Sequence, residues 1–99
     1  MTDLKRGMPP SHPGAMIKQL YIVENGFSGA DIARALKMSN SAVNRLIQGK
    51  AAVTPSMAIR LSKVLHGTPE LWLSLQSKYD LWMAKEESQG LELERLVCN

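Results

Sequence analysis

Short polar side chains crowd one predicted helix in the middle of the chain. The stretch SNSAVNRLIQGK, residues 39–50, places Asn40, Ser41 and Asn44 on one helical face, with Val43 and Leu46 on the other. Ser and Asn form helix less readily than Glu, Lys or Gln, so a purely solvated face would not favour them. Asn can pair bidentately with adenine, and Ser can donate to or accept from base edges. This pattern is typical of a helix that reads bases in the DNA major groove.

Basic and polar residues flank this face along the sequence. No Asp or Glu occurs between residues 32 and 69, whereas Lys and Arg recur there. Taken singly, each of these cations is better explained as a solvated surface charge than as a DNA contact, and Ser39 is first of all a helix cap. Taken together with the polar helix they favour contacts with DNA phosphates. The predicted backbone contacts are Ser28, Arg34, Lys37, Ser39, Arg45, Gln48 and Lys50.

Charge is distributed unevenly along the 99 residues. Residues 1–66 contain nine Lys and Arg against three Asp and Glu, whereas residues 67–99 contain three against six. A basic body suits a polyanion, and an acidic C-terminal region suits a basic protein partner. From charge alone, an ordinary solvated surface explains the imbalance as well.

Helix-starting and helix-ending signals predict an all-α fold. Thr-Pro pairs open two of the helices, Ser residues cap two others, and glycines close three of them. The five predicted helices cover about 14–23, a short stretch capped by Ser28 with Asp31, Ser39 to about Gln48, a stretch from Thr54 to Gly67, and about 69–86. We divide the chain into a flexible arm over 1–12, a helix-turn-helix domain over 13–83 with its motif at about 28–49, and an acidic tail over 84–99.

Several functional classes find no support in the sequence. The chain has no apolar run of membrane-spanning length and no signal-peptide core, so we expect a cytoplasmic protein without a membrane partner. Cys98 is the single cysteine, and neither His12 nor His66 has neighbours at metal-ligand spacing, so we expect no metal and no cofactor. No nucleophile–base set, phosphate loop or carboxylate pair can be assembled, which predicts that the protein is not an enzyme.

The last strong helix carries a stripe of large side chains. Trp72, Leu75, Tyr79 and Trp82 follow helical spacing, which usually marks core but here also suits a surface for self-association. We predict a dimer, because repressors with this kind of reading helix bind paired half-sites. Beyond residue 84 the pattern LELERLV fits neither helix nor strand cleanly. A strand, a helix and a disordered terminus stay open for it, as do pairing with a partner and simple mobility.

The order of these segments resembles a known family. SGADIARALKMSNSAVNRLIQGKAAVTPSMAIRLSKVL resembles the helix-turn-helix of the phage-repressor-like (Xre) family. The flanking HPG and GTPELWLSLQSKYDLW narrow the resemblance, over roughly residues 12–83, to the HigA antitoxins of HigB–HigA toxin–antitoxin modules. Two positions depart from the pattern. Lys37 stands where many relatives carry Gly, and Gly29 stands where phage repressors often place a Gln that touches DNA, so we assign no contact to position 29.

The resemblance implies a dimeric antitoxin that binds a palindromic operator, represses its own operon and neutralises a HigB-type, ribosome-dependent mRNA-cleaving toxin. By position, Asn40, Ser41 and Asn44 match base readers of the family. Backbone contacts of the family match Ser39, Arg45, Gln48 and Lys50. Such a protein is cytoplasmic and associates with the nucleoid when it is bound to DNA. Two alternatives stay open, namely a plain Xre-type repressor without a toxin and a protein-binding module that uses the fold as scaffold.

Overall fold

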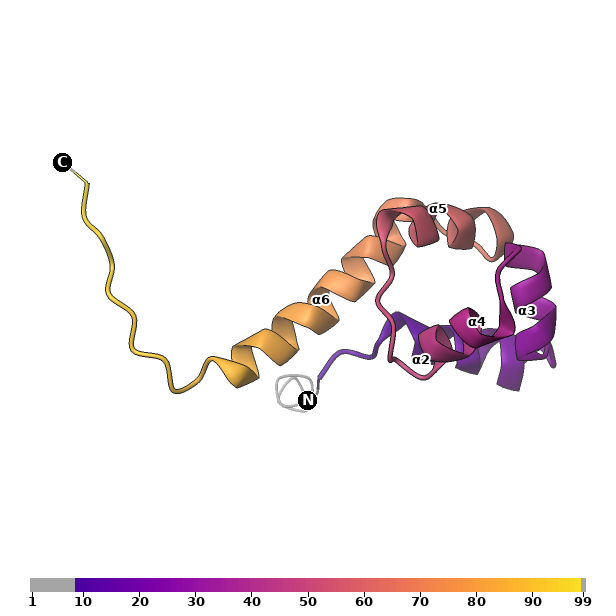
Figure 1. Cartoon of the computed structure of the whole chain (residues 1–99), viewed down its shortest axis with the longest axis horizontal. Coiled ribbons are helices and arrows are strands. Elements are labelled where there is room, and N and C mark those ends of the chain that lie inside the picture. The colour runs from indigo at the N-terminus through magenta and orange to yellow at the C-terminus, as the bar shows by residue number, and fades with distance from the viewer. Residues whose placement is uncertain (1–8, 99) are drawn as a thin grey trace, which may run out of the picture.

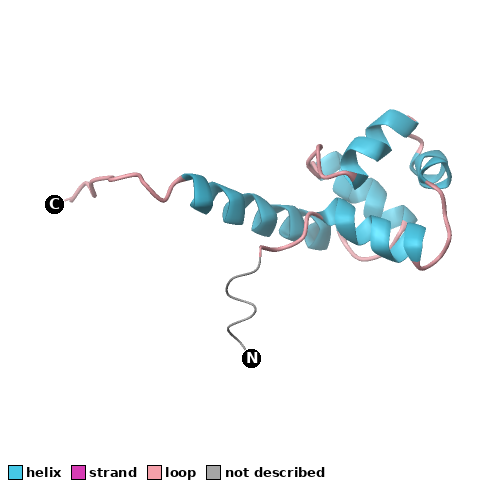
Figure 2. Cartoon of the chain, turned by 90° about the horizontal axis from the view of Figure 1, so that it is seen from below, coloured by secondary structure: helices cyan, strands magenta, loops and turns pink. Residues whose placement is uncertain are grey.

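Helices account for most of residues 9–98, the part of the chain that the computed structural model describes. Within this part there are five helical segments and no strand, as the sequence predicts. They are α2 (Pro13–Ile17) continuing into η1 (Lys18–Val23), α3 (Gly29–Leu36), α4 (Asn40–Ile47), α5 (Pro55–Val64) and α6 (Pro69–Glu87). The first four segments and the start of α6 cluster together, and the rest of α6 projects from the cluster (Figures 1 and 2). The predicted arm over residues 1–12 lies mostly outside the described residues.

The predicted caps form the predicted hydrogen bonds. Ser28 Oγ accepts from the amide of Asp31 at 3.0 Å, and the Asp31 carboxylate accepts from the Ser28 amide at 2.9 Å, which completes a capping box. Thr54 and Thr68 each accept from the amide three residues later, with a proline at the first helical position in both cases. The helix boundaries therefore follow from local sequence chemistry.

The first helix differs from the prediction in one respect. The predicted helix over 14–23 is present, but its second half, η1, is π-helical, with the Glu24 amide donating to the Gln19 carbonyl at 3.0 Å. Apolar spacing over one or two turns does not specify whether a hydrogen bond spans four residues or five. The sequence pattern therefore located this helix without showing its change of register.

One hydrophobic core joins the helices. The buried side chains include Ile17 of α2, Leu36 of α3, Val43 and Leu46 of α4, and Leu61 of α5. From α6, Trp72 is fully buried, and its indole N–H donates to the His66 carbonyl at 2.9 Å. The prediction that Trp72 belongs to a dimer surface is wrong. Its side chain is enclosed within a single chain and has no surface left for a partner.

A buried histidine joins the start of α2 to α6. His12 Nδ1 accepts from the Gly14 amide at 2.9 Å, and its ring meets Tyr79 edge to face with 5.0 Å between centroids. Burial lowers the pKa of His12, and the Asp80 carboxylate and the Ala51 carbonyl offset this only in part. A neutral imidazole leaves Nδ1 free to accept, so the cap and the lowered pKa are consistent.

The C-terminal part of the chain leaves large apolar side chains uncovered. Leu81 and Met83 of α6 are 55% and 42% exposed. After a turn that follows α6, residues 91–98 run extended and away from the cluster (Figure 1). Leu93 and Leu96 are more than four-fifths exposed. Of the alternatives left open for this segment, neither a strand nor a helix is observed up to residue 98.

Backbone contact between α2 and α4 requires a glycine at position 14. A Cβ added to Gly14 would lie 1.8 Å from the carbonyl oxygen of Leu46, far inside any tolerable contact. This close approach sets the distance between α2 and the C-terminal end of α4. We expect Gly14→Ala to lower the free energy of unfolding by about 3 kcal/mol or more, since backbone must move to relieve the overlap. Urea denaturation followed by circular dichroism measures this loss.

Gly90→Ala is the matched control, because a Cβ there meets nothing within 4 Å. Its free energy of unfolding should change by no more than about 0.5 kcal/mol. Equal stability of the two variants would show that α2 and α4 do not approach as closely as the structure indicates.

Candidate nucleic-acid interface

Helix α4 has one buried face and one exposed face. Val43 and Leu46 are each 1% exposed and pack into the core, and Ile47 is half-buried beside them. The predicted base readers Asn40, Ser41 and Asn44 are all exposed, as are the predicted backbone contacts Arg45 and Gln48. The structure therefore brings these five side chains to the face of α4 opposite its packing face.

The turn between α3 and α4 is left-handed at one residue. Lys37 has φ 59° and ψ 49°. Among residues 9–98 it is the only residue other than glycine with a positive φ. The amide of Lys37 donates to the Arg34 carbonyl at 3.2 Å, and that of Met38 donates to the Ala33 carbonyl at 2.9 Å. These bonds close the C-terminus of α3 in the manner usually given to glycine. Lys37 therefore adopts the left-handed turn conformation even though it is not a glycine.

Ser39 caps the N-terminus of α4. Its Oγ accepts from the Ala42 amide at 3.1 Å, and its own backbone is extended. The first amides of an α-helix point outward and carry positive potential, which attracts anions. Ser39 is exposed beside Asn40 and Ser41, so the cap, the helix terminus and two of the predicted base readers occupy the same end of α4.

Among the predicted phosphate contacts, Arg34 differs from Arg45 and Lys50 in the groups that surround it. Arg45 and Lys50 lie together, since an Arg45 guanidinium nitrogen is 3.5 Å from the Lys50 carbonyl oxygen. Arg34 is instead 3.4 Å from the Asp31 carboxylate, whose pKa is lowered first by the Ser28 amide and then by the Ser28 hydroxyl. Asp31 therefore stays ionised and offsets part of the Arg34 charge. Arg45 and Lys50 have no such acid beside them along the sequence.

Gly29 lies against Asn44. A Cβ at position 29 would be 3.3 Å from Asn44 Oδ1, which is tighter than ordinary packing. The first turn of α3 and the middle of α4 are therefore close neighbours. The absence of a side chain at position 29 leaves space for the Asn44 amide, although no DNA contact is assigned to Gly29 itself.

Sequence reasoning overlooked Arg60 of α5. One of its guanidinium nitrogens donates to the Leu36 carbonyl at 2.6 Å and lies 3.4 Å from the Lys37 carbonyl. These partners are 24 and 23 residues away in the chain. No local spacing rule could have connected them, because the contact exists only once α5 packs beside α3.

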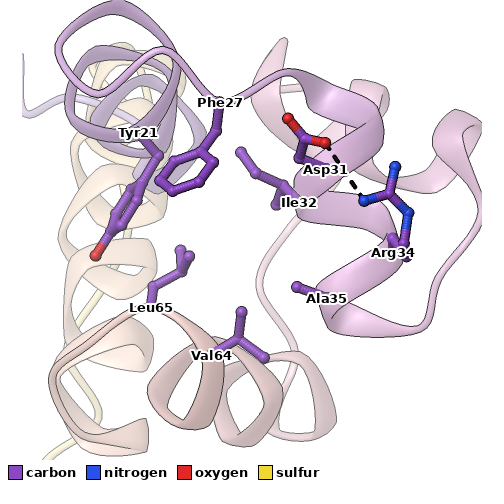
Figure 3. Close-up of a pocket in the computed structure, with 8 residues that line it drawn as sticks. All are labelled: Tyr21, Phe27, Asp31, Ile32, Arg34, Ala35, Val64 and Leu65. Carbon is purple, nitrogen blue, oxygen red and sulfur yellow. Dashed lines mark hydrogen bonds and ion pairs between the residues drawn. The ribbon is translucent and has the colours of Figure 1, made fainter.

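A hollow of about 390 Å³ separates α3 from the C-terminal end of α5. Figure 3 shows its wall of Tyr21, Phe27, Ile32, Val64 and Leu65, with the Asp31–Arg34 pair at the rim. None of the residues that line it belongs to α4, so the hollow is separate from the α4 face. Among residues 9–98, no group of three His, Cys, Asp or Glu could hold a metal ion, and no helix could span a bilayer.

A capped, exposed polar helix that follows a short helix through a left-handed turn defines a helix-turn-helix domain. Comparison with known proteins agrees with this class. A family described as Helix-turn-helix matches residues 17–73, and the chain belongs to this family. Proteins similar to this chain include transcriptional regulators and antitoxins, and the family is not a known class of enzymes.

Three proteins with known names are similar to this chain over most of its length. An uncharacterized HTH-type transcriptional regulator of Escherichia coli K12, YddM, is 40% identical over 86% of this chain and 89% of its own. The antitoxin GraA, solved in complex with its operator, is 39% identical over 93% of this chain and 96% of its own, with a TM-score of 0.81. The Pseudomonas aeruginosa antitoxin HigA, solved with the higBA promoter, is 33% identical over 89% of this chain and 99% of its own, with a TM-score of 0.80.

Ser39 has a structural role that can be measured without DNA. We expect Ser39→Ala to lower the free energy of unfolding by about 1 kcal/mol, because the Ala42 amide loses its acceptor. Ser39→Asp should retain most of the stability, since Asp caps as well as Ser. Ser41→Ala is the control, because Ser41 is exposed within the helix and caps nothing. Equal losses in Ser39→Ala and Ser41→Ala, measured by urea denaturation, would contradict the capping role.

Proposed function

We propose that this protein is an antitoxin-type repressor that binds the operator of its own operon. One observation carries the proposal, namely that the exposed face of α4 holds Asn40, Ser41 and Asn44 while the opposite face is buried. A helix must present its base-reading side chains together and away from its own core in order to enter the major groove. Similar proteins solved with operator or promoter DNA support the same reading of the fold.

In this proposal Asn40, Ser41 and Asn44 contact base edges. Their short side chains allow the N-terminal half of α4 to come close to the bases, where the longer Glu or Lys would hold it away. Sequence-independent contacts come from the residues around them, through charge, amide or hydroxyl groups, and fix the helix in the groove. The proposed backbone contacts are Ser28, Arg34, Lys37, Ser39, Arg45, Gln48 and Lys50.

The proposed DNA-binding unit is a dimer related by a two-fold axis. Two α4 helices must meet major grooves about one turn of DNA apart, about 34 Å, which one chain cannot do. The projecting part of α6 supports this, because Leu81 and Met83 are 55% and 42% exposed there. Leu75, Tyr79 and Trp82 remain proposed interface residues, each of them half-buried rather than enclosed.

The proposed protein partner is a HigB-type, mRNA-cleaving toxin. Support comes from the similarity to antitoxins and from the excess of acidic residues over 67–99, which suits a basic partner. Neutralisation and operator binding would then use different surfaces of one small domain. A plain repressor without a toxin and a scaffold that binds only protein are the competing functions.

Operator binding is tested by a mobility shift on DNA from upstream of the protein's own gene. The double variant Asn40→Ala, Asn44→Ala should lose about tenfold to hundredfold in affinity per base contact and should discriminate less between operator and scrambled DNA. Lys50→Ala should instead weaken binding to both DNAs and reduce the slope of log K against log salt by about 1. Lys78→Ala on α6 is the charge-matched control. Unchanged binding by the folded double variant would favour the scaffold function.

Toxin neutralisation is tested by co-expression with the product of the adjacent gene. Expression of that gene alone should stop growth, and the full chain should restore growth and co-purify with its product. The Asn40→Ala, Asn44→Ala variant should still restore growth, because the proposed base readers are not needed for protein binding. An adjacent gene whose product does not arrest growth would leave a plain repressor as the function.

A further inference from the structure

Arg60 of α5 bonds to the C-terminal end of α3. The last carbonyls of an α-helix lack partners within the helix, and a cation at this end is favoured by the helix dipole. Arg60 Nη1 donates to the Leu36 carbonyl at 2.6 Å and lies 3.4 Å from the Lys37 carbonyl. One guanidinium thus contacts the last residue of α3 and the left-handed residue that follows it.

This contact falls on the residue that sets the course of the chain into α4. A left-handed conformation is unfavourable for any residue with a Cβ, and Lys37 has one. A right-handed Lys37 would rotate the peptide groups that follow and change the angle between α3 and α4. The short-range bonds of the Lys37 and Met38 amides hold the turn from within, and Arg60 holds it from the neighbouring helix.

We propose that Arg60 is a positioning residue for DNA recognition. It holds Lys37 in its left-handed conformation and thereby fixes α4, with Asn40, Ser41 and Asn44, at the angle that the major groove requires. This inference rests on the proposed operator binding and adds to it a residue that does not touch DNA. Both contacts come from one nitrogen, Nη1, and the planar guanidinium fixes the direction of its N–H groups toward the two carbonyls, whereas a lysine ammonium acts as a point charge.

Two other roles for Arg60 make different predictions. As a phosphate contact, Arg60 would contribute to the salt dependence of binding, by about 1 in the slope of log K against log salt. As a purely structural residue, Arg60 would affect stability but not the affinity of the folded protein. As a positioning residue, it should affect operator affinity without changing the slope, and its effect should depend on the residue at position 37.

The experiment measures operator and scrambled-duplex affinity for the full chain and four variants. They are Arg60→Met, Lys37→Gly, the double variant, and Lys63→Met as a control that removes an exposed charge from the same helix. All are compared at a temperature where circular dichroism shows each to be folded. Arg60→Lys, which keeps the charge but replaces the planar guanidinium with an ammonium, is included in case Arg60→Met does not fold.

We expect Arg60→Met to bind the operator about tenfold more weakly, with an unchanged salt slope and unchanged affinity for the scrambled duplex. In the Lys37→Gly background the loss should shrink to about threefold or less, because glycine adopts the left-handed conformation without help. Arg60→Lys should show an intermediate loss of about threefold. Lys63→Met should not reduce discrimination between the two duplexes.

Three results would overturn the inference. The first is a slope reduced by about 1 in Arg60→Met, which would make Arg60 a phosphate contact. The second is normal operator affinity in the folded variant, which would make Arg60 purely structural. The third is an equal loss with and without the Lys37→Gly substitution, which would separate Arg60 from the turn. If the unaltered protein fails to prefer operator over scrambled duplex, the proposed function itself is wrong, and this result differs from the other three.

Discussion

Burial of Val43 and Leu46 fixes the orientation of α4, and the candidate interface depends on that orientation. The helix has only eight residues, so two fully buried side chains already determine which way every other residue points. Once they pack against α2 and α3, Asn40, Ser41 and Asn44 must face outward. The exposed polar face is therefore a geometric consequence of the core, and the short polar residues on it are the part of the pattern that stability alone does not explain.

The connections at the two ends of α4 confine the helix further. At its N-terminal end, Lys37 adopts a conformation that the chain elsewhere gives to Gly26, Gly49 and Gly67. At its C-terminal end, Gly14 of α2 lies directly against the Leu46 carbonyl. Lys37, a left-handed residue with a Cβ, thus constrains one end of α4, and Gly14, an obligatory glycine, constrains the other. Such constraints are expected where a helix must keep a precise angle, because an unfavourable backbone conformation persists only where the surrounding structure holds it in place.

The sequence was informative wherever the determining interaction is local. Ser28 with Asp31, Ser39, Thr54 and Thr68 each bond within three residues, so the helix starts could be predicted from residue types alone. Apolar spacing likewise predicted the buried face of α4. It could not show which of the large side chains on α6 are enclosed by the core, since Trp72 is enclosed and Trp82 is not. It also could not reveal Arg60, because a partner 24 residues away is selected by the packing of α5 beside α3.

Helix α6 has two parts with different surroundings, which the sequence merges into one stripe. Its first part completes the core through Trp72 and through Gln76, whose side chain accepts from the Val53 amide at 2.8 Å and donates to Asp80 at 2.9 Å. Its second part extends beyond the helical cluster (Figure 2). Leu81 and Met83 of this part are exposed. Because the first part is anchored in the core that also orients α4, a partner bound to the second part would be held rigidly relative to the reading face. A two-fold pair built this way would transmit the spacing of its α6 contacts directly to the spacing of its two α4 helices.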